Sequence, residues 1–326
     1  MNTNILLLSA GRRVKLYHIL QEELALLFPN AIVIAADANP AFSSVCAIAS
    51  SFVELPFTTD ANFGFALASV CNEMNIGLII PTTDFDANAL AIALEESNIP
   101  TSTQILGSSK EFVLKCQDKV LTCTIFKEAN VNFLMPLAPE DFEFPLFMKP
   151  RYGYSSEDCR IIEEEGDLPK SILELEDFGD YIFQYYLPPN EFQEYSIDCY
   201  YNLKSTLLCA VPRKRISTRG GEVSKSMTQK NEVYTWVWEN FSSLNGATGP
   251  ITLQCFLNLK TKDVVAGEIN PRLAGGYTLS HAAGANFVKY ALEEYLLKKT
   301  ILPTENWKEN VLMLRFDDEI IKQTGQ

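Results

Sequence analysis

The chain has 326 residues, with 41 aspartates and glutamates against 27 lysines and arginines, which gives a formal net charge of −14. Because a domain usually has roughly 100–200 residues, this length predicts two or three domains. Hydrophobic residues make up 47% and charged residues 21%, as is typical of a folded soluble protein. The acidic balance excludes a protein that coats nucleic acid or is held on anionic lipid by its overall charge, but it does not exclude a local basic pocket.

The first third of the chain alternates short apolar runs with helical patterns. Strands are predicted at residues 4–10, 31–37, 52–56 and 78–84, and helices at 13–28, 42–50, 62–75 and 85–97. Near-continuous apolar strands separated by helices indicate a parallel sheet that is covered on both faces. We therefore expect an α/β protein that begins with a Rossmann-like domain over residues 1–107.

The turn after the first strand resembles a nucleotide-binding βαβ unit only in part. Gly11 follows that strand and opens a helix, and Asp37 ends the next strand. One of the three glycines of the dinucleotide fingerprint is present, so an NAD-dependent oxidoreductase is the weaker alternative. Since helix N-termini favour anions and Arg12 and Arg13 flank the turn, it can still receive part of a substrate.

The pattern changes after residue 107. A helix is predicted at about 109–129, and short strands at 146–149, 159–162, 181–187, 195–201 and 207–212, followed by a hairpin at 251–270 and a packing helix at about 286–299. Such a series of strands indicates a mixed, mostly antiparallel α+β domain over residues 108–326.

The hairpin carries the strongest chemical pattern. Two strands, 251–257 and 264–270, are joined by a polar turn centred near Thr261. Side chains alternate along a strand, so Glu268 and Asn270 point to one face, and a hairpin symmetric about Thr261 places Gln254 opposite Glu268. Carboxylate and amide oxygens are the ligands that Mg²⁺ prefers when phosphate oxygens also hold it. The alternative is a solvated polar face of an amphipathic hairpin.

The hairpin continues as GEINPRLAGG, and with a Gln fourteen residues before the Glu it resembles the metal-binding motif of the ATP-grasp superfamily. The similarity is greatest to the branch of the carbamoyl-phosphate synthase large subunit and biotin carboxylase. It implies that Glu268 and Asn270 bridge two Mg²⁺ ions (or Mn²⁺) to ATP, that Gln254 assists, and that Arg272 reaches the transferred phosphoryl group. It also implies a lid subdomain at about 110–185 and a catalytic subdomain at about 186–326.

Further motifs follow in the order of that family. Lys119 in CQDK and Lys149 in FPLFMKP resemble the lysines that contact ATP phosphates, and the segment RYGYSS resembles a phosphate-covering loop, here with a single glycine. Phosphate contacts from Ser155 and Ser156 are expected to replace the missing glycines. Glu194 in EYSID resembles the carboxylate that binds the ribose hydroxyls. The segment expected to bind adenine, largely through its main chain, consists of Gln184, Tyr185, Tyr186 and Leu187.

Residues 213–230 form a basic segment with six basic residues and one acid. Such a run is usually a solvated face. Because the rest of the chain is acidic and the segment contains a Gly-Gly pair, we expect Arg213 or Arg215, with Arg219, to orient a carboxylate or the γ-phosphate. RNA binding is not expected, because no aromatic residues interleave with the charges.

The resemblance implies an ATP-dependent ligase that joins a small carboxylic acid to an amine or a thiol through an acyl phosphate. An ATP-binding regulatory or scaffold protein that lacks ligase activity is the main rival. The eight cysteines are scattered without a C-x-x-C pair, no export signal is evident, and no apolar stretch approaches the roughly 20 residues that span a bilayer. A cytoplasmic protein with reduced thiols is expected, with small-molecule substrates and neither nucleic-acid nor membrane partners; a homodimer is left open.

Overall fold

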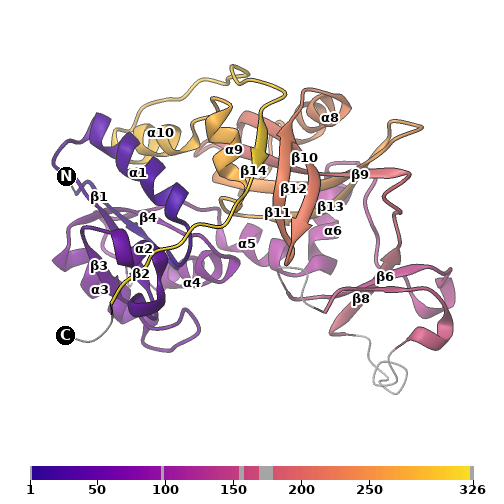
Figure 1. The fold of residues 1–326 in the computed structure, drawn as a ribbon, viewed down its shortest axis with the longest axis horizontal. Helices are drawn as coiled ribbons and strands as arrows, with labels where there is room; N and C mark the ends of the chain where they lie inside the picture. The colour runs from indigo at the N-terminus through magenta and orange to yellow at the C-terminus, as the bar shows by residue number, and fades with distance from the viewer. Residues whose placement is uncertain (1, 97–98, 154–157, 169–178, 324–326) are drawn as a thin grey trace.

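The computed structural model describes residues 2–96, 99–153, 158–168 and 179–323, and these contain three β-sheets (Figure 1). A five-stranded sheet belongs to the N-terminal part of the chain. A six-stranded sheet and a separate three-stranded sheet belong to the remainder. Among the described residues, no helix combines the length and apolar character that crossing a membrane requires.

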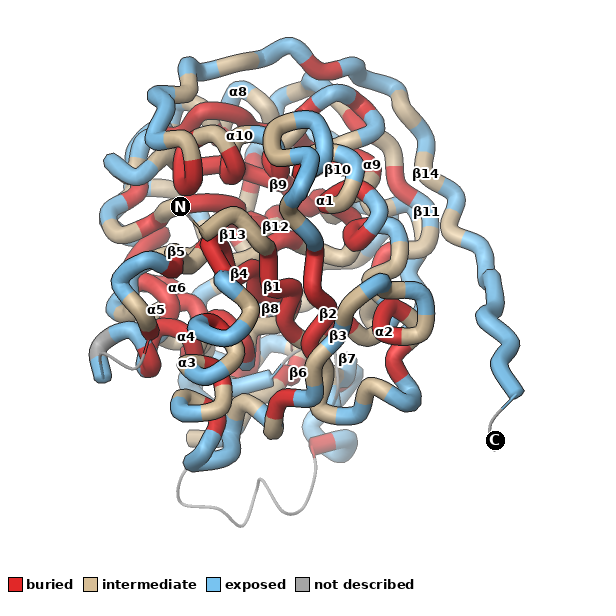
Figure 2. Tube along the Cα trace, turned by 90° about the vertical axis from the view of Figure 1, so that its left-hand side faces the viewer, coloured by how far each residue is buried: buried red, intermediate tan, exposed pale blue. Residues whose placement is uncertain are grey.

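The N-terminal sheet has the order β3-β2-β1-β4-β5, and all its strand pairs are parallel. Figure 2 shows its central strands as continuously buried. This confirms the Rossmann-like prediction, although β4 begins two residues before the predicted start and stops at Ile80, because Pro81 cannot donate a ladder hydrogen bond. The elements are β1 (Asn4–Leu7), α1 (Val14–Leu27), β2 (Val33–Asp37), η1 (Pro40–Phe42), α2 (Ser44–Ile48), β3 (Phe52–Glu54), α3 (Phe63–Glu73), β4 (Ile76–Ile80), α4 (Asp84–Glu95) and β5 (Gln104–Ile105).

Two helices replace the single helix predicted over residues 109–129, so that prediction is wrong. They are α5 (Lys110–Gln117) and α6 (Lys119–Glu128), and the break falls at Asp118, whose backbone is extended. The Asp118 carboxylate accepts hydrogen bonds from the N–H groups of Val120 and Leu121. An aspartate competes in this way with helix continuation and favours a new N-terminus.

The three-stranded sheet has the order β7-β6-β8 and antiparallel pairing; we call it the lid sheet. Its strands are β6 (Leu146–Pro150), β7 (Arg160–Ile162) and β8 (Tyr181–Tyr185). It has a small core of its own around Met148 and Phe183, and it lies apart from the six-stranded sheet in Figure 1.

The six-stranded sheet has the order β13-β12-β9-β10-β11-β14 and only antiparallel pairs. The basic segment forms most of the β10–β11 hairpin, whose turn is Gly220-Gly221 with both φ angles positive. Helix α8 and strand β14 were not predicted. The elements are β9 (Phe192–Tyr201), β10 (Leu207–Arg219), β11 (Glu222–Thr228), α8 (Glu232–Phe241), β12 (Gly249–Asn258), β13 (Val264–Asn270), α9 (Tyr277–Ala282), α10 (Phe287–Ala291) with a π-helical turn (Leu292–Leu296), and β14 (Leu312–Leu314).

The two halves of the chain share one hydrophobic core. Leu16 and Leu20 of α1 belong to the same buried cluster as Tyr200 of β9, Tyr277 of α9 and Phe287 of α10. The C-terminal segment leaves β14 and crosses the view of the N-terminal sheet domain in Figure 1, but Figure 2 shows it extending away from the body, and residues 316–323 are exposed. The N-terminal domain is therefore held against the second half by packing at α1.

Candidate functional site

The β12–β13 hairpin has the predicted register at its chemically important end. Gln254 pairs with Glu268, and Thr252 pairs with Asn270. A bulge follows, so Cys255 pairs with Ala266 and Gly267 is the extra residue on β13. The predicted pairing of Gln254 with Glu268 is confirmed, and the bulge confines it to the end of the hairpin farther from the Thr261 turn.

These three side chains suit a hard divalent cation. Asn270 is buried, Glu268 and Gln254 are partly buried, and no hydrogen bond or ion pair joins the Glu268 carboxylate to another described residue. The described residues contain no group of three or more His, Cys, Asp or Glu side chains that could hold a metal by themselves. One carboxylate with two amide oxygens is a set that Mg²⁺ accepts when phosphates and water complete its shell. The donor set therefore fits the metal that the motif implies.

Lys149 of β6 connects the lid sheet electrostatically with this hairpin. Its side chain is buried, and burial lowers the pKa of Lys149 while the charge of Glu268 raises it and that of Lys119 lowers it further. Lys119, at the start of α6, donates from Nζ to the Gly153 carbonyl at 2.9 Å. Two cations and one carboxylate thus meet between the lid sheet and the β12–β13 hairpin, an arrangement suited to a polyphosphate bound with a divalent cation.

Asp118 fixes the start of the segment that follows β6. Arg151 donates to its two carboxylate oxygens at 2.9 and 2.6 Å, and the Tyr152 hydroxyl donates at 2.9 Å. Burial opposes ionisation, but the hydrogen bonds from Arg151 and Tyr152 outweigh it and lower the pKa of Asp118 to about 2. The sequence drew attention to this motif for Lys119; only the three-dimensional contacts identify Asp118 as the anchor. Ser155 and Ser156 lie outside the described residues.

The segment expected to bind adenine begins on β8. The Gln184 side chain is buried and donates from Nε2 to the Leu134 carbonyl at 2.6 Å, so it serves as a link to the strand-like segment beside β13. Tyr185 ends β8 and is half-exposed, and Tyr186 and Leu187 follow it outside any strand of the described chain. Their main-chain groups are the ones that would be available to a base.

Glu194 of β9 lies close to the proposed metal site and is held by a cation. Arg215 Nε is 3.0 Å from Glu194 Oε2. Burial raises the pKa of Glu194, the Arg215 charge opposes this rise, and the charge of Glu268 adds to it. The structure therefore brings the predicted ribose ligand Glu194 and the predicted anion ligand Arg215 together as an ion pair beside Glu268.

The structure does not bring the three arginines of the basic segment together. Arg213 is fully buried and donates to both carboxylate oxygens of Asp198, at 2.7 and 2.8 Å. Ser280 also donates to Asp198, at 2.6 Å. Arg219 lies on the exposed end of the hairpin and pairs with Asp317 of the C-terminal segment. Arg215 alone of the three is beside the residues predicted to bind ATP.

Arg272 lies where the hairpin meets the N-terminal domain. Its Nη2 donates to Asp84 Oδ2 at 2.6 Å and lies 3.5 Å from Asn270 Oδ1. Asp84 is the first residue of α4, so this ion pair joins the β12–β13 hairpin to the first domain. Sequence reasoning missed Asp84, whose only signal was its place just after the short turn between a parallel strand, which ends at Ile80, and the helix that follows.

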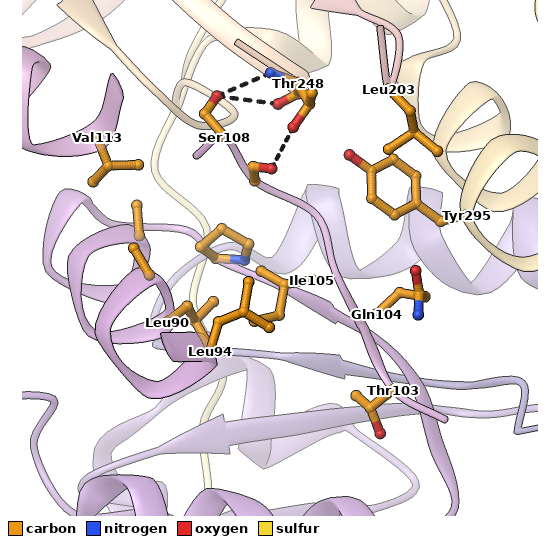
Figure 3. A pocket seen from close by; sticks show the side chains of 14 residues that line it. Leu90, Leu94, Thr103, Gln104, Ile105, Ser108, Val113, Leu203, Thr248 and Tyr295 are labelled. Carbon is orange, nitrogen blue, oxygen red and sulfur yellow. Dashed lines mark hydrogen bonds between the residues drawn. The ribbon is translucent and has the colours of Figure 1, made fainter. Parts of the chain in front are cut away.

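A separate pocket of about 220 Å³ lies between α4, β5 and the start of β12 (Figure 3). Leu90, Leu94 and Ile105 line it, and Ser108 and Thr248 are joined by hydrogen bonds at its rim. None of the predicted site residues lines this pocket. It is an apolar gap at the junction of the two halves, and it is distinct from the charged face described above.

Comparisons with known proteins agree with the geometry. A family model described as "ATP-grasp in the biosynthetic pathway with Ter operon" matches residues 177–314, and one described as "PylC-like, N-terminal domain" matches residues 5–102. No curated protein matches the chain.

Several solved structures share the fold at low sequence identity. The biotin carboxylase domain of 2-oxoglutarate carboxylase from Hydrogenobacter thermophilus has a TM-score of 0.73 at 13% identity, covering 95% of this chain and 73% of that one. N5-carboxyaminoimidazole synthetase from Staphylococcus aureus has 0.70 at 16% identity, with coverages of 96% and 82%. An L-amino acid ligase from Bacillus licheniformis has 0.68 at 16% identity, with 90% and 74%. The TM-scores establish a common fold, and at identities this low the similarity is one of fold alone.

Proposed function

We propose that the chain is an ATP-dependent ligase that joins a carboxylic acid to an amine through an acyl phosphate. The matches of its two parts to a PylC-like N-terminal domain and to an ATP-grasp domain support this. The observation that carries the proposal is the pairing of Gln254 with Glu268, beside Asn270 and within the electrostatic reach of Lys149. A thiol in place of the amine is the closest alternative acceptor.

The protein's own groups have separable tasks in this proposal. Lys119 and Lys149 hold the phosphates. Glu268, Asn270 and Gln254 would hold Mg²⁺, or Mn²⁺ in its place, on the side of the phosphates opposite the lysines. When bound, such a cation neutralises charge on the phosphate oxygens. Arg272 is next to Asn270 and is suited to orient the transferred phosphoryl group.

The proposed reaction has two steps. A carboxylate oxygen attacks the γ-phosphorus of ATP, the bond to the β-phosphate oxygen breaks, and ADP leaves. The amine nitrogen then attacks the acyl carbon, the bond to the phosphate oxygen breaks, and phosphate leaves while the nitrogen loses a proton to solvent. No protein nucleophile is needed, so the site has to supply positioning and positive charge, which Lys119, Lys149 and Arg272 provide.

The structural relatives support this class of chemistry. One was solved with MgADP, ADP and bicarbonate, and another is an amino acid ligase. An ATP-binding regulatory protein would share the fold without the second step. An NAD-dependent enzyme would use the turn at Gly11, where Asp37 Oδ2 accepts the Gly11 N–H at 2.9 Å and so is already engaged by its own turn.

The first prediction tests nucleotide binding and turnover. We expect Mg·ATP, and not NADH, to raise the melting temperature, and an ADP-release screen over pairs of acids and amines to find a coupled pair. Glu268→Gln should lower ADP release at least about 100-fold, because the carboxylate is the single charged ligand of the proposed cation.

Asp263→Asn is the matched control, since Asp263 is an exposed acid on the turn of the same hairpin. This variant should retain full turnover. Absence of any thermal shift with millimolar Mg·ATP would overturn the nucleotide assignment, and full turnover by Glu268→Gln would overturn its metal role. Mg·ATP binding without product from any pair would favour the regulatory alternative.

A further inference from the structure

The loop that follows the metal-binding hairpin is surrounded by guanidinium groups. A Cβ atom at Gly275 would lie 2.6 Å from Arg13 Nη1 and 3.6 Å from Arg315 Nη2, and one at Gly276 would collide with Arg213 Nη1. The two glycines therefore let three arginines from distant parts of the chain approach one short stretch of backbone. We call Arg13, Arg315 and this Gly275-Gly276 loop the arginine pocket.

Arg13 has no opposite charge of its own. No described carboxylate forms an ion pair with it, and its recorded hydrogen bond goes to the Thr82 carbonyl at 3.2 Å. Burial and the charge of Arg272 lower the pKa of Arg13 to about 10, with Arg315 and Arg12 adding to the effect and Glu222 opposing it. A half-buried guanidinium among like charges is a costly arrangement for a protein unless an anion joins it.

The surroundings of Arg13 keep an excess of positive charge. Four guanidinium groups act there, those of Arg12, Arg13, Arg272 and Arg315, and two carboxylates pair with them, Glu222 and Asp84. Four positive and two negative charges leave two positive charges uncompensated. In a chain whose overall charge is −14, this local excess is large enough to bind a dianion.

The pocket lies beside the proposed reaction centre and is distinct from it. Arg272 connects the two, because it lies 3.5 Å from Asn270 on one side and acts electrostatically on Arg13 on the other. A molecule whose reacting carboxylate is at Arg272 would extend its remaining atoms toward Arg13 and Arg315. Two buried nitrogens in the same region, Arg213 Nη1 and Arg272 Nε, have no hydrogen-bond partner among the described residues. The region therefore contains donors that a bound anion could satisfy.

We propose that the acid substrate carries a second anionic group, a carboxylate or a phosphate, and that Arg13 and Arg315 bind this group in the arginine pocket. The proposal rests on the ligase function above and adds the substrate class. Planar guanidinium groups bind both oxyanions bidentately, so the two share one recognition chemistry. Arg315 Nη1 donates to Glu222 Oε2 at 2.5 Å and its Nη2 to the Gly275 carbonyl at 2.9 Å, and these contacts hold the side chain at the pocket.

The second prediction concerns the affinity for acids with and without a second anionic group. Calorimetry measures their binding to the protein saturated with Mg·ADP. The pairs are glutarate against butyrate and 3-phosphoglycerate against glycerate, which differ by one anionic group. The member with the extra group should bind at least about 10-fold more tightly, as expected for charge-assisted hydrogen bonds. The pair with the larger ratio identifies carboxylate or phosphate as the preferred group.

Variants locate the effect. Arg13→Gln and Arg315→Gln should each remove most of the preference while leaving the affinity for Mg·ADP unchanged. Lys15→Gln is the matched control, because Lys15 is an exposed cation two residues after Arg13 and is not one of the four guanidinium groups counted above. Arg315 is on the C-terminal segment, so its replacement tests the pocket even if Arg13→Gln fails to fold.

The outcomes separate the two proposals. Equal affinity within both pairs, or loss of the preference in Lys15→Gln as complete as in Arg13→Gln, would overturn the arginine pocket even with Mg·ADP bound. Failure of Mg·ADP to bind would instead overturn the nucleotide site and the proposed function.

Discussion

Arg213 and Asp198 show how the surroundings of a charged residue decide its task. Both side chains are almost fully buried, and every oxygen of Asp198 is engaged by Arg213, Ser280 or Thr252. Arg219, six residues along the same strand, forms an exposed pair with Asp317. The Arg213–Asp198 pair therefore holds β9, β10 and α9 together, and the Arg219–Asp317 pair contributes little to the free energy of unfolding.

The third prediction compares these pairs. Asp198→Asn leaves the Arg213 charge buried without a counter-charge and should lower the free energy of unfolding by about 3–5 kcal/mol. Arg219→Gln should change it by less than about 1 kcal/mol, because the exposed pair is screened by solvent. Urea unfolding of the two variants measures both values, and similar losses would show that the Arg213–Asp198 pair is not a structural pair.

Asp118 gives a residue-level prediction for acid pH, the fourth. Its folded-state pKa of about 2 lies below its ordinary value of 3.8, so its stabilisation is complete above about pH 4 and is lost as the pH falls toward 2. Asp118→Asn should therefore be less stable than the natural protein at pH 6, and the difference should shrink in unfolding experiments between pH 4 and pH 2.5. A difference that stays constant over this range would contradict the assignment.

At the scale of elements, local patterns predicted the hairpin well and the helix breaks poorly. Alternation over two adjacent strands fixes the pairing of Gln254 with Glu268, because hairpin register depends on nearby residues. The break between α5 and α6 comes from Asp118, which caps α6 by accepting hydrogen bonds from the N–H groups of Val120 and Leu121, while the apolar pattern continues through it. Local periodicity carries no information about such contacts.

The basic segment shows the same limit for the site. A run of arginines resembles a solvated face, but β10 pairs on both sides and its first half is buried. The chain order of the motifs indicated Lys119, Lys149 and Glu268, which the structure places together. Asp84, Arg13 and Arg315 come from three separate regions, so only the fold could show their proximity to Arg272.

Strand β14 is short and pairs only with β11 through residues such as Met313 and Ser226. It covers the outer edge of β11 and carries Arg315 into the arginine pocket. A covered edge is protected from pairing with other chains. The segment therefore serves both the sheet and the proposed substrate site.

The fifth prediction concerns this segment. Ending the chain after residue 310 removes β14 and Arg315, and should abolish the preference for dianionic acids while Mg·ATP still raises the melting temperature. Ending it after residue 318 keeps β14, Arg315 and the Arg219–Asp317 pair, and should preserve the preference. Equal acid binding by the two shortened chains, measured by calorimetry, would contradict a role for Arg315.

At the scale of the whole molecule, net charge and local charge have different consequences. The net charge of −14 comes mostly from acids on the surface. The proposed phosphate and acid sites are instead lined by the cations Lys119, Lys149, Arg272 and Arg13. Small anions are drawn to the cationic face, and large polyanions are repelled by the remainder of the surface. Such a distribution favours a metabolite over a nucleic acid as the ligand.

The core shared at α1 also determines which parts can move. Leu16 and Leu20 of α1 lie in one buried cluster with Tyr200, Tyr277 and Phe287 of the second half, whereas residues 316–323 of the C-terminal segment are exposed. The two larger units are therefore fixed to each other at this buried interface. The lid sheet has a small core of its own, so opening for substrate entry is expected to be a swing of the lid sheet.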